Sequence, residues 1–274
     1  MRLFPALTAG VIVNRQCTNM RITDKSIFSE YHALVGKNIP AWLEALGGEP
    51  QEADLTYQVR ASAVYSSNIE GNTVDLNSFM NSIASKTNFK PGKEVDEIKD
   101  LVAAYELAKQ HEPTEKNFLT AHKTMSRTLL IKDKRDRYRT ERMGVFDHSG
   151  MVYLAVEPGK VKAEMKLLFE DISQLLKTPL TPEAAFYHAS LLHLRLVHIH
   201  PFWDGNGRMA RLLEKWLLSN TLNGRAWALP SEKYYKEHLS DYYRNIRLGM
   251  DFYDLDYGKC LTFLAMLPAC MVTQ

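Results

Sequence analysis

The residues that could do chemistry lie together in one segment, His200 to Arg211, with the sequence HPFWDGNGRMAR. His200 is a candidate general base, because a neutral imidazole has a pKa near physiological pH. Pro201 disfavours the α conformation at His200, so the imidazole should stand where a helix has just ended. A residue that abstracts a proton benefits from being held in such a fixed position.

The second half of this segment is typical of a polyphosphate-binding site. Gly205, Asn206 and Gly207 permit backbone conformations in which several N–H groups point the same way. A helix is expected to begin there, and helix N-termini favour anions. Arg208 and Arg211 lie three residues apart in its first turn and therefore share a face. Together these features predict a site for a polyphosphate.

Asp204 lies just before the anion-binding loop, where a carboxylate would repel phosphate unless a cation lay between them. Mg²⁺ is commonly held by one or two carboxylates together with substrate phosphates. Asp204 is therefore predicted to bind Mg²⁺. The alternative is that Asp204 is the N-cap of the following helix.

Other nucleotide and metal motifs do not fit. GNGRMA satisfies the dinucleotide pattern G-x-G-x-x-A, but a helical segment rather than a strand precedes it. A calcium-binding loop starting at Asp204 would need Gly and Glu where the chain has Met209 and Lys215. The sequence has no G-x-x-x-x-G-K-[ST]. Because HExxH is also missing, core or surface positions are favoured over zinc binding for three upstream histidines, His188, His193 and His198.

The elements that must position this segment are helices and one hairpin. A buried helix is predicted over 182–199, with Thr181 as N-cap, because its apolar residues leave little polar face. Other helices are predicted over residues 54–70, 94–110, 115–130, 160–177, 207–220, 231–248 and 257–266. Residues 144–158 alternate as two short strands around a turn. The predicted fold class is all-α with one β-hairpin.

Composition limits the classes of partner. The chain has 274 residues, with 34 Lys+Arg against 32 Asp+Glu, a net charge of +2. This balance excludes a broad nucleic-acid surface. No apolar run approaches the ~20 residues that span a bilayer, so no membrane partner is expected. The basic run from Lys132 to Arg142 alternates with acidic residues and is predicted to be a solvated face.

The cysteines and the first residues bear on location and boundaries. Cys17, Cys260 and Cys270 form no CxxC pair and have no zinc-finger spacing, which favours a reducing cytoplasm. Residues 1–20 are predicted to be disordered, vector-derived or the product of a misassigned start, with Met20 as an alternative initiator.

The segment 200–211 resembles the signature of the Fic family, H-P-F-x-[DE]-G-N-G-R-x-x-R, at every specified position. His193, Leu196 and Ile199 fit the pattern just upstream, and Tyr138-Arg139 falls within the resemblance, which covers about residues 30–250. It implies a Fic-like helical bundle. The expected divisions are an N-terminal helical region (21–112), a catalytic core (113–250) with a substrate-binding flap (144–158) and a C-terminal helix (251–274).

The resemblance implies transfer of a nucleotide monophosphate, most often AMP from ATP, to a Ser, Thr or Tyr hydroxyl of a target protein. His200 would take the hydroxyl proton, and Asp204 would hold Mg²⁺. The loop 205–207 would cradle the phosphates, and Arg208 and Arg211 would bind the β and γ phosphates. The target would lie along 144–158, unless that segment is a plain structural hairpin. Tyr243 is predicted either to contact adenine or to be a core aromatic.

An upstream segment resembles an inhibitory motif of the same family. Residues 66–71, SSNIEG, match [ST]-x-x-x-E-[GN] at the end of the helix predicted over about 54–70. Glu70 in the last turn is disfavoured by the helix dipole, so a compensating cation is expected. The resemblance identifies that cation as Arg211, whose pairing would displace the γ phosphate, and implies that Ser66 contacts the phosphate loop. The alternative is a solvent-facing glutamate beside a C-cap glycine.

Two rival functions remain open. The same site could remove AMP, or could transfer UMP, phosphocholine or phosphate. Alternatively the chain could be a noncatalytic adaptor that senses ATP, although the intact His200 and Asp204 argue against this. A homo-oligomer is a further expectation, as a layer of regulation.

Overall fold

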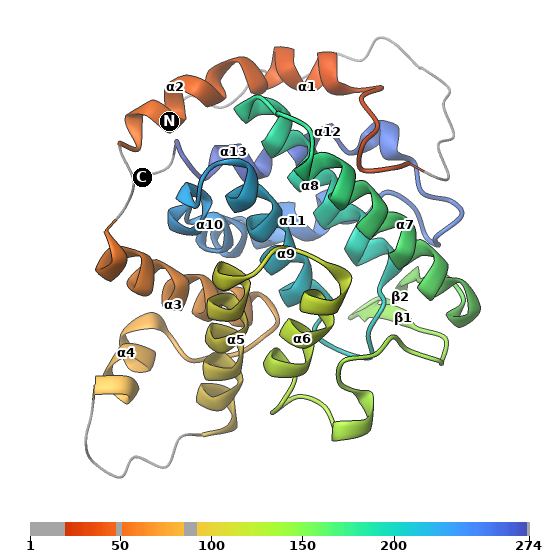
Figure 1. Ribbon diagram of the computed structural model, residues 1–274. Helices are drawn as coiled ribbons and strands as arrows, with labels where there is room; N and C mark the ends of the chain where they lie inside the picture. Colours follow the sequence, from red (N-terminus) through yellow and green to blue (C-terminus); the bar gives the residue numbers. More distant parts are fainter. Residues whose placement is uncertain (1–19, 48–50, 85–91, 273–274) are drawn as a thin grey trace.

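The computed structural model describes residues 20–47, 51–84 and 92–272 (Figure 1). The predicted segment 1–20 thus lies outside the described residues, apart from Met20, which is buried. The helices and strands are α1 (Phe28–Leu34), α2 (Ile39–Ala45), α3 (Glu52–Ile69), α4 (Leu76–Ala84), α5 (Lys93–Gln110), α6 (Glu115–Met125), β1 (Gly144–Asp147), β2 (Gly150–Leu154), α7 (Pro158–Leu176), α8 (Pro182–Ile199), α9 (Asn206–Thr221), α10 (Ser231–Glu237), α11 (Leu239–Ile246), α12 (Leu261–Leu264) and α13 (Met266–Ala269).

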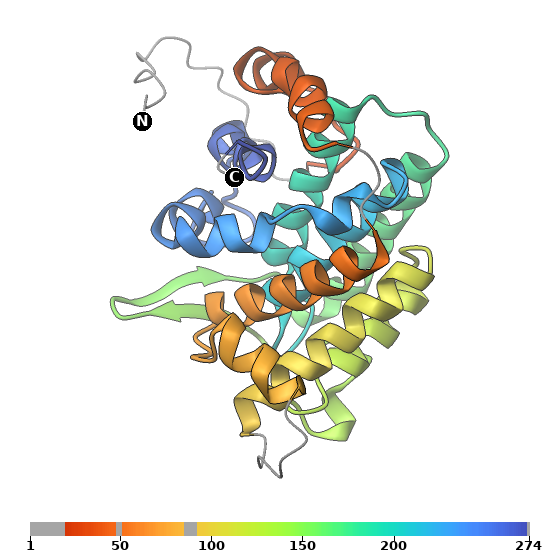
Figure 2. The same cartoon turned by 90° about the vertical axis from the view of Figure 1, so that its left-hand side faces the viewer.

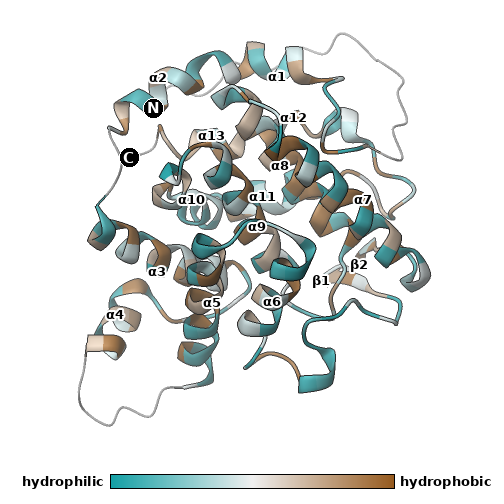
Figure 3. Cartoon of the chain, viewed as in Figure 1, coloured by the Kyte–Doolittle hydropathy of each residue, from teal (hydrophilic) through white to brown (hydrophobic). Residues whose placement is uncertain are grey.

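The core is built around α8 and α9, which lie in the middle of the bundle with the other helices packed about them (Figure 1). Hydrophobic residues gather along this pair (Figure 3). Almost every side chain of α8 is buried, as its lack of a polar face predicts. The helix has the predicted bounds, and Thr181 occupies the N-cap position, although its side chain makes no capping hydrogen bond.

The hairpin formed by β1 and β2 projects from the helical bundle (Figure 2). Its strands pair antiparallel from Gly144 opposite Leu154 to Asp147 opposite Gly150, with a bulge between Val145 and Phe146. The all-α fold class with one hairpin is therefore confirmed. None of the described helices is long and apolar enough to cross a bilayer.

Three of the predicted helices are wrong in extent or continuity. Helix α6 ends at Met125 rather than at residue 130, and Thr128 beyond it is held by Asp100 through its N–H and hydroxyl (2.9 and 2.7 Å). The helix predicted over 231–248 is broken at His238 (φ −112°, ψ 39°) into α10 and α11. The one predicted over 257–266 is a 3-10 turn followed by α12 and α13. Helices α1, α2 and α4 were not predicted.

The basic run between Lys132 and Arg142 is only partly a solvated face. Lys132 and Arg137 are exposed and Lys134 is half-buried, but Arg139 is only 1% exposed. Its guanidinium donates hydrogen bonds to main-chain carbonyl groups, which replace water around the charge. The prediction is therefore wrong for this residue, because alternation of charges along the sequence does not reveal a partner made of backbone.

Candidate active site

His200 stands at the end of α8 in a left-handed conformation (φ 51°, ψ 59°), so the prediction that it is not helical is confirmed. Its Nδ1 lies 3.3 Å from the carbonyl oxygen of Val197 and donates to it, which leaves Nε2 with the lone pair. The residue lines a cavity of about 590 Å³. Burial is the main cause that lowers the pKa of His200 to about 4. The imidazole is therefore neutral at physiological pH and able to accept a proton.

The loop after His200 is closed by the side chain of Asn206. Its Oδ1 accepts the N–H of Phe202 and its Nδ2 donates to the carbonyl of Phe202, both at 2.9 Å. Gly205 is the N-cap of α9 with φ 82°, and a Cβ there would lie 2.3 Å from the methyl of Met125. This left-handed conformation favours glycine, and a Cβ there would also have to displace the methyl group of Met125. The side-chain amide of Asn206 therefore shapes the loop. The phosphate contact predicted for Asn206 would have to come from its main-chain N–H.

His122 of α6 packs against the loop, a contact that the sequence analysis did not predict. Its ring stacks on Phe202 with centroids 3.6 Å apart and planes 6° apart. Burial lowers the pKa of His122 to about 4, so the ring is neutral, and its Nε2 lies 3.2 Å from the carbonyl of Asp204. A histidine in α6, far upstream in sequence, leaves no local signal from which this role could be predicted.

Asp204 is half exposed, with 49% of its side chain accessible. Its Oδ1 accepts the N–H of Gly205 at 2.6 Å and lies 3.5 Å from Nη2 of Arg208. The N-cap alternative is wrong, because Gly205 holds that position. Within the described residues no group of three or more acidic, His or Cys side chains could hold a metal ion by itself. A single exposed carboxylate fits a Mg²⁺ ion that takes its remaining ligands from phosphate and water.

Arg208, in the first turn of α9, is buried but poorly partnered. Its nearest carboxylates are Asp204 at 3.5 Å and Glu97 at 3.9 Å. Its Nε has no hydrogen-bond partner within the described part of the chain. A buried donor without an acceptor costs free energy, so the side chain has capacity for an anionic ligand.

Arg211, one turn further along α9, is fully engaged with the end of α3. Its Nε donates to Ser66 Oγ at 2.8 Å, and its Nη2 donates to Ser66 O at 3.0 Å and to Glu70 Oε1 at 2.6 Å. Its Nη1 donates to the hydroxyl of Tyr242 at 3.0 Å. The expected contact between Glu70 and Arg211 is thus present. Ser66, by contrast, hydrogen-bonds Arg211 rather than the phosphate loop.

The Glu70 carboxylate lies directly over Gly207. A Cβ on Gly207 would come within 2.3 Å of Glu70 Oε1. Burial opposes ionisation of Glu70, but Arg211 and Arg208 outweigh it and hold its pKa below the ordinary value. Glu70 is an exposed residue, but its carboxylate is bound to Arg211 rather than to solvent alone, so the alternative of an unpaired solvent-facing glutamate is wrong. An ionised carboxylate therefore occupies the mouth of the predicted phosphate loop.

Comparison with known proteins identifies the family of the segment that contains these residues. Residues 112–218 match the model of the Fic/DOC family. This segment is a Fic/DOC family domain. Fic adenylyltransferases of Drosophila erecta (31% identity over 216 residues) and Drosophila ananassae (32% over 212 residues) align with 75% and 74% of this chain. The chain spans only 39% and 38% of their lengths.

Solved Fic structures share the fold. A Fic family protein from Desulfovibrio desulfuricans G20 superposes with a TM-score of 0.69 at 25% identity, over 91% of this chain and 74% of that one. Fic-1 from C. elegans superposes with a TM-score of 0.63 at 20% identity, over 89% and 71%. The Fic-like helical bundle is therefore confirmed.

The Fic hairpin forms one wall of the cavity and has one open edge. Leu154 of β2 donates to Met250 O at 2.9 Å, and Phe252 donates to Leu154 O at 3.1 Å, so the outer edge of β2 is partly paired. Phe146 and Met151, opposite each other in the register, are 69% and 51% exposed. Among the described residues, no main-chain hydrogen bond covers the outer edge of β1.

Tyr243 lies at the other side of this Fic cavity. It is 41% exposed, so the alternative of a core aromatic is wrong. Its hydroxyl donates to the carbonyl of Ile69 at 3.0 Å, and Lys236 donates to the carbonyl of Asn68 at 2.7 Å. These two side chains hold the end of α3 against α10 and α11.

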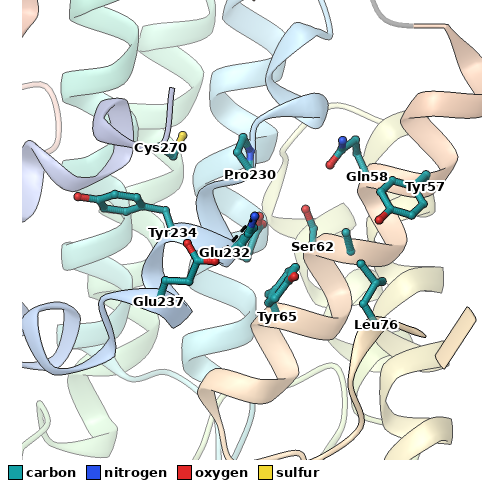
Figure 4. Close-up of a pocket in the computed structure, with 12 residues that line it drawn as sticks. Tyr57, Gln58, Ser62, Tyr65, Leu76, Pro230, Glu232, Tyr234, Glu237 and Cys270 are labelled. Atoms are coloured by element: carbon teal, nitrogen blue, oxygen red, sulfur yellow. Dashed lines mark ion pairs between the residues drawn. The ribbon is translucent and has the colours of Figure 1, made fainter. Parts of the chain in front are cut away.

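The three histidines of α8 for which a core or surface position was favoured over zinc binding lie inside the protein. The rings of His188, His193 and His198 are buried, and each is within hydrogen-bonding distance of a carbonyl or a tyrosine hydroxyl. A second cavity of about 300 Å³ lies between α3 and α10 (Figure 4). No predicted site residue lines it. Ser62, on its wall, accepts a hydrogen bond from Lys215 at 2.8 Å, and Lys215 pairs with Glu232 at 2.5 Å.

Proposed function

We propose that the chain is an autoinhibited protein adenylyltransferase, which transfers AMP from ATP to a Ser, Thr or Tyr hydroxyl of a target protein. The observation that carries this is the junction of α8 and α9. There the neutral His200 and Gly207 line one cavity, and α9 begins with the incompletely partnered Arg208 in its first turn. The relatives named protein adenylyltransferase support the choice of AMP as the transferred group.

The proposed reaction is an in-line displacement. The target hydroxyl oxygen forms a bond to the α-phosphorus, the bond from that phosphorus to the oxygen bridging to the β-phosphate breaks, and pyrophosphate leaves. His200 Nε2 takes the hydroxyl proton. Main-chain N–H groups of Asn206 and Gly207, in the loop 205–207, and the guanidinium of Arg208 neutralise charge on the departing phosphates. Mg²⁺ held by Asp204 would supply further neutralisation there.

Autoinhibition in this proposal follows from the position of Glu70. Arg211 is the predicted partner of the γ phosphate, and its Nη2 is already bound to Glu70 at 2.6 Å. Two anions cannot share the space above Gly207 without repulsion. Displacement of Glu70 is therefore needed before ATP binds with its α-phosphate towards His200.

The proposed target is an extended segment that pairs with the β1 edge. Strand addition supplies main-chain hydrogen bonds without requiring a particular sequence. The exposed Phe146 and Met151 add apolar contacts beside it. Such binding would present one hydroxyl of the target towards the cavity that His200 lines.

The test compares ATP labelled on the α-phosphate with ATP labelled on the γ-phosphate, using the Glu70→Gly variant. We expect protein labelling from the α position alone, lost in His200→Ala and kept in His32→Ala, which changes an exposed histidine of α1. Labelling from the γ position would identify phosphate transfer instead. Release of AMP from a labelled target would indicate removal. A cellular effect that persists in His200→Ala would identify an adaptor.

A further inference from the structure

Arg139 is a buried cation that is held by the backbone. Its Nε donates to the carbonyl of His200 at 2.7 Å and its Nη1 to that of Glu141 at 2.8 Å. Its Nη2 donates to the carbonyls of Val156 at 2.5 Å and Ile199 at 3.3 Å. All four hydrogen bonds from this side chain within the described residues therefore end on carbonyl oxygens. A buried charge needs such a full set of partners.

These carbonyl groups belong to three segments that meet at the site. Ile199 and His200 end α8, Glu141 precedes β1, and Val156 follows β2. The N–H of Arg139 also donates to the carbonyl of Pro201 at 2.9 Å. The last carbonyls of a helix lack intrahelical partners and form the negative end of its dipole. One guanidinium thus satisfies the end of α8 and joins it to both ends of the hairpin.

We propose that Arg139 is a positioning residue for the His200 base and for the target-binding hairpin. It holds His200 in a left-handed backbone conformation, which few residues other than glycine adopt. It also fixes the hairpin relative to the imidazole, so that a hydroxyl bound along β1 approaches Nε2. The proposal rests on the proposed function, because it concerns the transfer step at the same site.

The charge of Arg139 also acts on the imidazole. Burial is the main cause of the low pKa of His200, and Arg139 lowers it further, whereas Glu70 and Asp204 raise it. Loss of the positive charge should therefore raise the pKa of His200. The other titratable or charged side chains facing the cavity are Asp147, His148, Tyr153, His198, Tyr242, Tyr243 and Arg247.

The test uses two variants of Arg139 in the uninhibited Glu70→Gly protein. Arg139→Gln removes the charge, and Arg139→Lys keeps the charge without the planar fork of donors. The matched control is Arg225→Gln, because Arg225 also donates to main-chain carbonyls (Leu43 and Gly47, both 2.6 Å), but lines a different cavity. Each protein is checked for folding by circular dichroism and melting temperature.

Two readouts are expected to separate positioning from general stability. NMR titration of the labelled imidazole should give a higher pKa for His200 in Arg139→Gln than in the parent, Arg139→Lys or Arg225→Gln. The kcat should fall in both Arg139 variants, by about a hundredfold if the base is displaced by about 1 Å. The KM for ATP should stay unchanged. Arg225→Gln should keep the kcat of the parent.

The outcomes that overturn the proposal are equally specific. A folded Arg139→Gln protein with the His200 pKa and kcat of the parent would overturn it, as would an equal loss of kcat in Arg225→Gln. If Arg139→Gln does not fold, Arg139→Lys decides, and parental kcat in that variant overturns the positioning role. The titration needs no transfer activity. Absence of labelling in the parent would therefore refute the proposed function while the titration still tests Arg139.

Discussion

Replacement of Glu70 is the perturbation whose effect follows most directly from the contacts. The ion pair joins a side chain that is 30% exposed to Arg211, which is 1% exposed. A hydrogen bond between charged groups contributes about 1.5–3 kcal/mol, and about 1.4 kcal/mol corresponds to a factor of ten. Loss of the Glu70 contact in Glu70→Gly should therefore favour ATP bound in the competent position by about tenfold to a hundredfold.

The assay is the initial rate of protein labelling from ATP labelled on the α-phosphate. Glu70→Gly should label about tenfold to a hundredfold faster than the wild type. Glu70→Gln should also label faster, because it removes the charge but keeps the shape. Glu44→Gly, at an exposed glutamate in α2, is the matched control and should label like the wild type. Equal rates for the wild type and Glu70→Gly, with ATP binding shown separately, would refute the reasoning.

Three further predictions concern pH and the loop. The pKa of His200 is about 4, and Glu70 is one of the groups that raise it. The kcat of the uninhibited Glu70→Gly variant should therefore fall on acidification only at about pH 4 or below, because only the neutral ring accepts a proton; a midpoint near 6.5 would contradict this. Gly205→Ala should lower the free energy of unfolding by about 1–3 kcal/mol in urea titrations, through left-handed strain and overpacking. Gly159→Ala, with open space around its Cβ, should not lower it. The free energy of unfolding should decrease by on the order of a few kcal/mol as the pH falls from about 6.5 to about 4. The reason is that two buried histidines stay neutral in the folded chain but are protonated in the unfolded chain over this range. These histidines are His122 and His198, with folded pKa values of about 4 and about 3. A free energy of unfolding that does not change over this pH range would contradict the conclusion that both rings are neutral in the folded chain.

The bounds of α8 and the start of α9 could be predicted because they depend on residues that are close together in the sequence. Pro201 disfavours the α conformation at His200, so α8 ends at Ile199, and the glycines of the loop permit the conformation that starts α9. The length and apolar pattern of α8 follow from its complete burial. Its bounds could therefore be predicted to the residue.

The remaining features depend on packing between segments that are distant in sequence. Met125 and His122 press against the loop from α6. Arg139 finds carbonyl partners in three separate segments, which no pattern of charges reveals. The break at His238 turns α10 and α11 apart, although the apolar spacing across it is compatible with one helix. Such contacts exist only once the chain has folded.

The most direct test of the account is a crystal structure of the Glu70→Gly variant with Mg²⁺ and a nonhydrolysable ATP analogue. We predict that the α-phosphate faces His200 Nε2 and that the γ-phosphate lies beside Arg211, in the space that the Glu70 carboxylate occupies. Asp204 is predicted to contact the metal ion. An analogue bound with its α-phosphate turned away from His200, while Arg211 is free of Glu70, would contradict both the transfer reaction and its inhibition.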